Sequence, residues 1–106
     1  MIILFCYLYR YSTHFKEYHE VAFTNVCQLP VAVIEQLITM HLTGGRCFVP
    51  DDWQLPNLFF TQWQNTHPPY HEFVQVKTQA CGTTTEGDIA VLLHTIQLHA
   101  AVHKVQ

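Results

Sequence analysis

Residues 2–11 read IILFCYLYRY, a run of β-branched and aromatic residues that decides the fold class. In an extended chain its side chains alternate between two faces, and both faces are apolar. One face carries Ile3, Phe5, Tyr7 and Tyr9, and the other carries Ile2, Leu4, Cys6 and Leu8. Strands that are covered on both sides have this composition, so we expect a central strand here. The run is shorter than the about 20 apolar residues that span a bilayer, and no basic residue precedes it as in a signal peptide.

Further strand-like segments follow along the chain, each bounded by turn-forming residues. Apolar and polar residues alternate in YHEVAFTNVC, and the polar residues before it suit a hairpin with the first strand. The four predicted strands are residues 18–27, 46–49, 57–63 and 70–78. Between the second and third, Asp51 or Asp52 is expected to cap a single helical turn.

Two segments have helical sequences. The first begins with Pro30 at the first helical position, continues with apolar residues at helical spacing, and ends at Gly44 and Gly45. The second covers residues 86–104, with Thr85 as N-cap and acidic residues in its first turn.

The predicted order of elements is therefore β-β-α-β-β-β-α over residues 1–106. We find no internal repeat, linker or low-complexity run. We expect a single α+β domain with a mainly antiparallel sheet of four to five strands and two helices.

Composition narrows the classes of function. Apolar residues make up 49% of the chain, charged residues only 12%, and the net charge is -3. The five basic residues stand singly and form no stripe for phosphates, so we expect neither nucleic acid nor a membrane as partner. The four cysteines form no CxxC pair, which favours free thiols in the cytosol. No cofactor motif is present, and we expect no cofactor.

The last helix carries two apolar stripes. One stripe forms a face suited to packing on the sheet and consists of Ile89, Leu92, Leu93, Ile96 and Ala100. A second stripe lies nearly opposite and consists of Val91, Leu98, Val102 and Val105. We expect it to be the interface of a homodimer; the alternative is that the first helix or a loop covers it.

Two histidines, His99 and His103, stand four residues apart on the same helix. Neighbouring imidazoles on one helix face can bind Zn, Cu or Ni. The alternative is a pair of boundary histidines that hydrogen-bond to backbone or water. Ala100 stands where a zinc protease of the HExxH type has its general base, so that class is excluded.

The aromatic stretch between residues 49 and 73 combines tryptophans with carboxylates. Such a mixture can line a pocket for a small ligand. The residues predicted to form it are Asp51, Asp52, Trp53, Trp63, Tyr70 and Glu72. The alternative is that these aromatic side chains fill the core.

Three hypotheses about function follow. The first is a non-catalytic interaction module that self-associates through its helix surface and holds a small ligand among the loop aromatics. The second is a transition-metal-binding protein that uses His99 and His103. The third is a small enzyme that uses Cys81, expected near the start of the last helix, or the carboxylates near Trp53.

Overall fold

The computed structural model describes residues 1–10, 16–56, 58, 70–82 and 86–104, and for residues 103 and 104 the backbone only. The strands are β1 (Ile2–Arg10), β2 (Lys16–Phe23), β3 (Cys47–Phe48) and β4 (His71–Gln79). The helices are α1 (Val31–Thr39), the short 3-10 helix η1 (Pro50–Trp53) and α2 (Ile89–Lys104). The predicted α+β class, with an antiparallel sheet and two helices, is confirmed.

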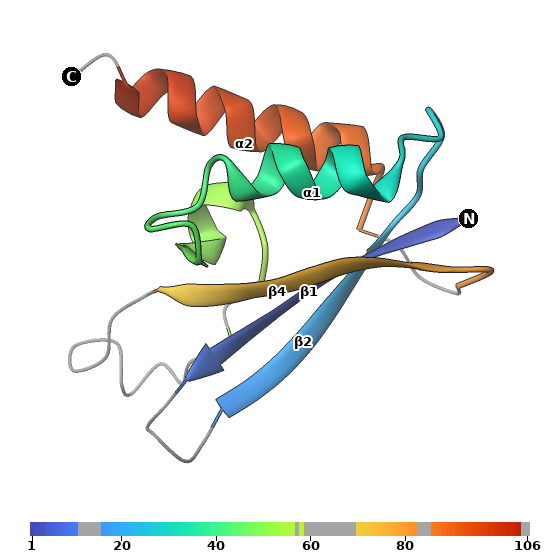
Figure 1. Cartoon of the computed structure of the whole chain (residues 1–106), viewed down its shortest axis with the longest axis horizontal. Coiled ribbons are helices and arrows are strands. Elements are labelled where there is room, and N and C mark those ends of the chain that lie inside the picture. The colour runs from blue at the N-terminus through green and yellow to red at the C-terminus, as the bar shows by residue number, and fades with distance from the viewer. Residues whose placement is uncertain (11–15, 57, 59–69, 83–85, 105–106) are drawn as a thin grey trace.

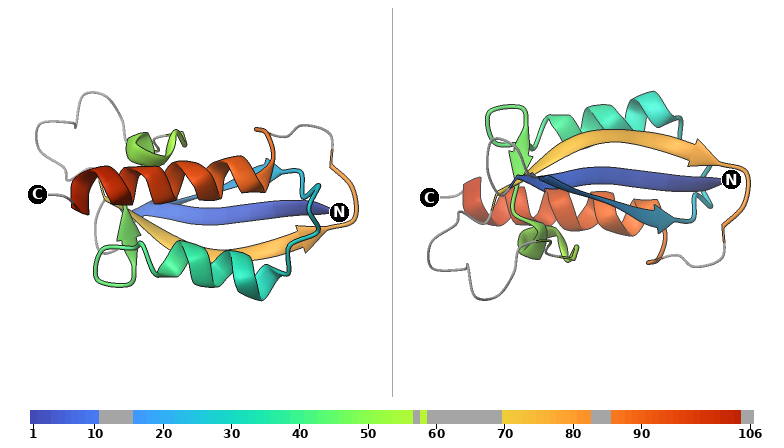
Figure 2. Two further views of the ribbon diagram at one scale, coloured as in Figure 1. Left: turned by 90° about the horizontal axis from the view of Figure 1, so that it is seen from above. Right: turned by 90° about the horizontal axis from the view of Figure 1, so that it is seen from below.

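The four strands form one antiparallel sheet in the order β2-β1-β4-β3. β1 is an inner strand, as expected from its two apolar faces, and Phe5 lies opposite Val21 of β2 and Val76 of β4. A register shift between Cys6 and Tyr7 marks a bulge against β4. α1 and α2 lie side by side over one face of the curled sheet (Figures 1 and 2).

The core lies between this sheet face and the two helices. Ile3, Phe5 and Tyr7 of β1 are fully buried there. The helices cover them with Ile34 and Ile38 of α1 and with four buried residues of the predicted α2 stripe, namely Ile89, Leu92, Leu93 and Ile96. Ala100, the fifth residue of that stripe, is only partly buried.

The other face of β1 is buried without a helix above it in the described part of the chain. Leu4, Cys6 and Leu8 are each less than a tenth exposed. Long side chains from the neighbouring strands close over them, because Lys77 Nζ of β4 lies 2.7 Å from Glu20 Oε2 of β2. Cys6 Sγ lies 3.6 Å from the same oxygen, so this ion pair passes over the thiol.

Asp88 fixes the start of α2 on the end of β2. Its Oδ1 accepts hydrogen bonds from the Thr24 hydroxyl and the Val26 N–H, both at 2.9 Å, and its Oδ2 accepts one from Ala90 N–H at 3.1 Å. These bonds hold the pKa of Asp88 below its usual value, chiefly through the Val26 N–H. α2 therefore begins at Ile89 rather than at residue 86, and the expected cap, Thr85, lies outside the described residues.

Several boundaries differ from the sequence-based expectations. α1 begins at Val31, with Pro30 as the N-cap residue rather than the first helical one. It ends at Thr39, ahead of Gly44 and Gly45, whose φ angles of 63° and 73° place them in the following turns.

Other expectations concern the loops and the second strand. β2 covers Lys16–Phe23 instead of residues 18–27, because beyond Phe23 the chain turns toward α2. Val49 precedes η1 without a side-chain cap, so neither Asp51 nor Asp52 caps it. The predicted strand at residues 57–63 lies outside the described residues except for Leu58, which is not in a strand.

Candidate functional site

Trp53 is part of the core. Its side chain is 4% exposed and its ring stacks on Phe48 with centroids 4.6 Å apart and planes 10° apart. The edge of Phe5 meets the same indole at 6.3 Å. The chain that follows η1 is held on the sheet because the Tyr7 hydroxyl donates to the Pro56 carbonyl at 2.7 Å. This packing agrees with the alternative that the aromatic side chains of this stretch fill the core.

Glu72 is bound by two arginines on the sheet face away from the helices. Its carboxylate accepts from Arg10 Nε at 2.8 Å and Arg46 Nη2 at 2.9 Å. These bonds, that to Arg10 first, hold the pKa of Glu72 below its usual value.

The six residues predicted to bind a ligand do not gather in the described structure. Asp51 and Asp52 are exposed on η1, Tyr70 is exposed before β4, and Trp63 lies outside the described residues. Glu72 is committed to its arginines, and Trp53 to the core. A ligand among these residues stays a prediction.

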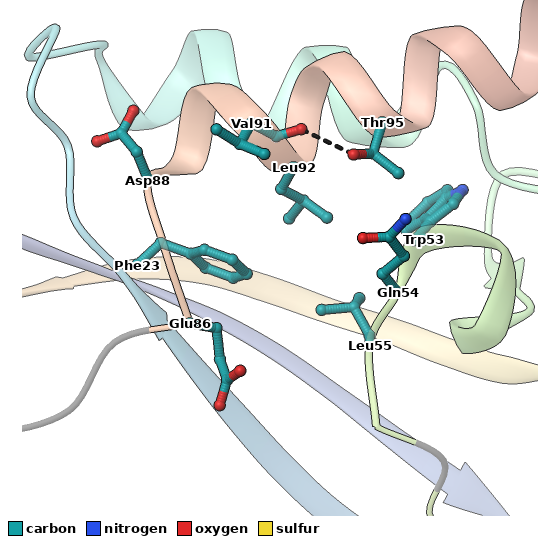
Figure 3. Close-up of a pocket in the computed structure, with 9 residues that line it drawn as sticks. All are labelled: Phe23, Trp53, Gln54, Leu55, Glu86, Asp88, Val91, Leu92 and Thr95. Atoms are coloured by element: carbon teal, nitrogen blue, oxygen red, sulfur yellow. Dashed lines mark hydrogen bonds between the residues drawn. The ribbon is translucent and has the colours of Figure 1, made fainter.

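A small cavity opens between α2, η1 and the end of β2 (Figure 3). Its volume is about 80 Å³, and Leu92, Phe23 and Leu55 point into its centre. Asp88 and Glu86 point away from that centre. Pockets for small organic ligands measure roughly 300–1,000 Å³, so this cavity suits water molecules or one inserted side chain.

The outer face of α2 carries several exposed apolar side chains. Val91, Leu98 and Val102 are 64%, 52% and 65% exposed, so α1 does not cover them. Val105, the fourth residue of the predicted stripe, lies outside the described residues. A groove of about 310 Å³ runs beside this face, and its walls are Asp52, Gln54, Thr95, Leu98, His99 and Val102.

His99 lies at the rim of this groove. Its Nε2 lies 3.3 Å from Oδ2 of Asp52, which joins α2 to η1. His103 stands one turn further along α2, and its side chain lies outside the described part. Within the described part, no three His, Cys, Asp or Glu side chains are grouped closely enough to hold a metal ion.

The cysteines provide little support for nucleophilic chemistry. All four are free thiols. Cys81 is exposed in the turn after β4, where its carbonyl accepts from the Gln79 amide, and it is neither buried nor at the first turn of α2. Burial, with Glu20 nearby, raises the pKa of Cys6 to about 11, so this thiol stays protonated and unreactive at neutral pH.

Sequence reasoning missed the contacts between distant residues. The pairing of Asp52 with His99 joins positions 47 residues apart, and no local pattern indicates it. His71, fully buried, accepts the Leu58 N–H at Nε2 at 3.0 Å. The burial of His71 could have been predicted only if the residues around it had formed an apolar strand pattern.

Comparison of the chain with protein-family models, curated proteins and solved structures finds no match. None of the helices in the described ranges is long and apolar enough to cross a membrane.

Proposed function

We propose that this domain is a non-catalytic interaction module that forms a homodimer through the outer face of α2. The observation that carries the proposal is a line of three apolar side chains on α2, each of them at least half exposed: Val91, Leu98 and Val102. An exposed apolar line on a helix that already buries its other face is typical of an interface. The cytosol is the compartment we propose, because the four cysteines are free thiols.

The spacing of this face suits pairing with itself. In an antiparallel pair of α2 helices related by a two-fold axis, Val91 faces Val102 of the second copy and Thr95 faces Leu98. Both pairings follow from one position of the axis, between residues 96 and 97. A surface that complements itself in this way fits the isologous contact of a two-fold dimer.

The groove beside α2 enlarges the contact. Asp52 of η1 and Gln54, which follows η1, form its far wall, so an apolar side chain of the second copy can enter between η1 and α2. Stable interfaces bury roughly 800 Å² per partner, more than three turns of one helix supply. We therefore expect an affinity in the micromolar range, with contributions from η1.

Sedimentation equilibrium of the wild-type protein and of Leu98→Glu tests the proposal. The average mass of the wild type should rise from one chain toward two across the micromolar range, and Leu98→Glu should stay at one, because an unpaired buried charge is costly. The control is Gln97→Glu, which adds the same charge at an exposed α2 position off the stripe. A wild type of single-chain mass throughout this range would reject the proposal.

A second candidate function, transition-metal binding, is favoured by the geometry of Asp52 and His99. Two ligands of one tetrahedral ion with bonds of about 2.0–2.1 Å lie about 3.3 Å apart. Asp52 Oδ2 and His99 Nε2 have this separation. His103, one turn along the helix, would be the third ligand.

A further inference from the structure

β2 is an outer strand of the sheet, and only its carboxyl end is covered in the described part of the chain. The Glu86 N–H donates to the Ala22 carbonyl at 2.8 Å, and the Thr24 N–H donates to the Gly87 carbonyl at 2.9 Å. The side chains of the preceding five residues, Lys16–Glu20, are exposed, and no described residue hydrogen-bonds to the backbone of Lys16, Tyr18 or Glu20 on the side away from β1.

The covered end shows which residues present their backbone outward. Ala22 and Thr24 bond away from β1, and backbone groups alternate in direction along a strand. Lys16, Tyr18 and Glu20 therefore direct their N–H and C=O groups to the open side, whereas Glu17 and His19 direct theirs to β1. An unpaired row of this kind is a template for another strand.

We propose that Lys16–Glu20 pairs antiparallel with the same segment of a second copy, centred on Tyr18. In this register Tyr18 lies opposite Tyr18, and Lys16 lies opposite Glu20 of the second copy. All three positions are outward-facing, so each facing pair exchanges two backbone hydrogen bonds. On the helix side of the sheet, Glu17 lies opposite His19.

The order of charges selects this register and this occupant. Centring the pair on Lys16, Glu17 or Glu20 places like charges directly opposite each other, which is unfavourable. Centring it on His19 leaves Lys16 opposite Ala22, whose carbonyl is already taken. Charges on an edge strand usually prevent pairing, but here they complement a second copy of KEYHE.

Glu20 can serve both neighbours. Its Oε2 lies 2.7 Å from Lys77 Nζ within the chain, and a carboxylate accepts several hydrogen bonds. Lys16 extends along the strand, with its Nζ 5.4 Å from the centroid of the Tyr18 ring. The pair would join two sheets into one continuous sheet. Five residues a side form a short contact, so it should require higher concentration than the α2 contact.

The strand contact and the α2 contact use different residues. The test is made in the Leu98→Glu variant, so that association through α2 does not contribute to the measured mass. Further substitution with Lys16→Glu, or with Glu20→Lys, makes each variant repel its own copies. In a mixture of the two variants, residue 16 of each chain faces residue 20 of the other, and the two residues of each facing pair carry opposite charges. Sedimentation velocity at several hundred micromolar should show monomers for each variant alone and dimers for the mixture.

Tyr18→Pro provides a second test that leaves Glu20 and Lys77 intact. It removes the outward N–H while keeping the backbone bonds to β1, and Tyr18→Val, which keeps that N–H, is the matched control. Association should be lost with proline and kept with valine. Amide exchange should also show protection of Tyr18 and Glu20 that rises with concentration. Equal masses for the separate and mixed charge variants, or unchanged association with proline, would overturn the proposal.

Discussion

Asp52 Oδ2 lies 3.3 Å from His99 Nε2, so η1 and α2 meet in a polar contact at the rim of the apolar groove. Both residues line the groove that the proposed dimer uses. The contact also places a carboxylate next to the first of the two histidines that sequence spacing singles out. A metal ion and a second copy would therefore act on the same part of the molecule.

Added Zn²⁺ or Ni²⁺ should raise the melting temperature of the wild-type protein. An ion bound only by the folded state adds about 2.7 kcal/mol at a free concentration one hundred times its dissociation constant. The double variant His99→Ala with His103→Ala should fold and lose this response, and Asp52→Asn should weaken it. Chelator alone should leave the melting temperature unchanged. Unfolding of the purified protein by chelator would contradict this, because it would make the metal structural.

Asp88→Ala should lower the free energy of unfolding by about 1–2 kcal/mol, the usual cost of losing an N-cap side chain. The substitution leaves the Val26 and Ala90 N–H groups without their acceptor. Asp88→Ser retains one acceptor at the cap and should recover part of the loss. Urea unfolding monitored by circular dichroism measures both, and equal stability of all three proteins would show that the contacts of Asp88 contribute nothing.

The contribution of Asp88 should also depend on pH. Its pKa is lowered in the folded state, so its stabilising effect is complete above the ordinary Asp value of about 3.9 and disappears as pH falls through the folded value. The difference in unfolding free energy between wild type and Asp88→Ser should therefore be constant near neutrality and shrink in acid. A difference that grows in acid would have the wrong sign.

Trp53→Ala should destabilise the fold by about 3–5 kcal/mol, as expected for a buried indole. Its stacking on Phe48 and its contact with Phe5 both disappear. Trp53→Phe should cost less, because an aromatic ring is kept. Thermal unfolding distinguishes this core role from a ligand-lining one, for which Trp53→Ala would leave stability almost unchanged.

Local patterns predicted most of the elements. The two apolar faces of residues 2–10 are sufficient to indicate an inner strand, and the helical spacing of Ile89, Leu92 and Ile96 indicates the face that packs on the sheet. Boundaries were less predictable, because they depend on partners distant in sequence. α2 starts where Asp88 meets Thr24 of β2, and nothing near residue 88 reveals that contact.

Only some features of the candidate sites could be predicted from local sequence. The exposure of Val91, Leu98 and Val102 follows from helix geometry, since a helix that buries one face leaves the opposite face exposed. The positions of the Trp53 and Glu72 side chains could not be predicted in this way, because they depend on contacts with Phe48 and with two arginines elsewhere in the chain. The open edge of β2 could be identified only from the strand order of the sheet, which a single sequence leaves undetermined.

Isotope-filtered NMR on a mixture of labelled and unlabelled chains detects whether α2 pairs with α2 of a second copy. We expect intermolecular contacts between the methyl groups of Val91 and Val102, and between Thr95 and Leu98. These contacts should vanish in Leu98→Glu and persist in Gln97→Glu. A wild-type sample that associates without any intermolecular contact from these four residues would show that α2 is not the dimer interface.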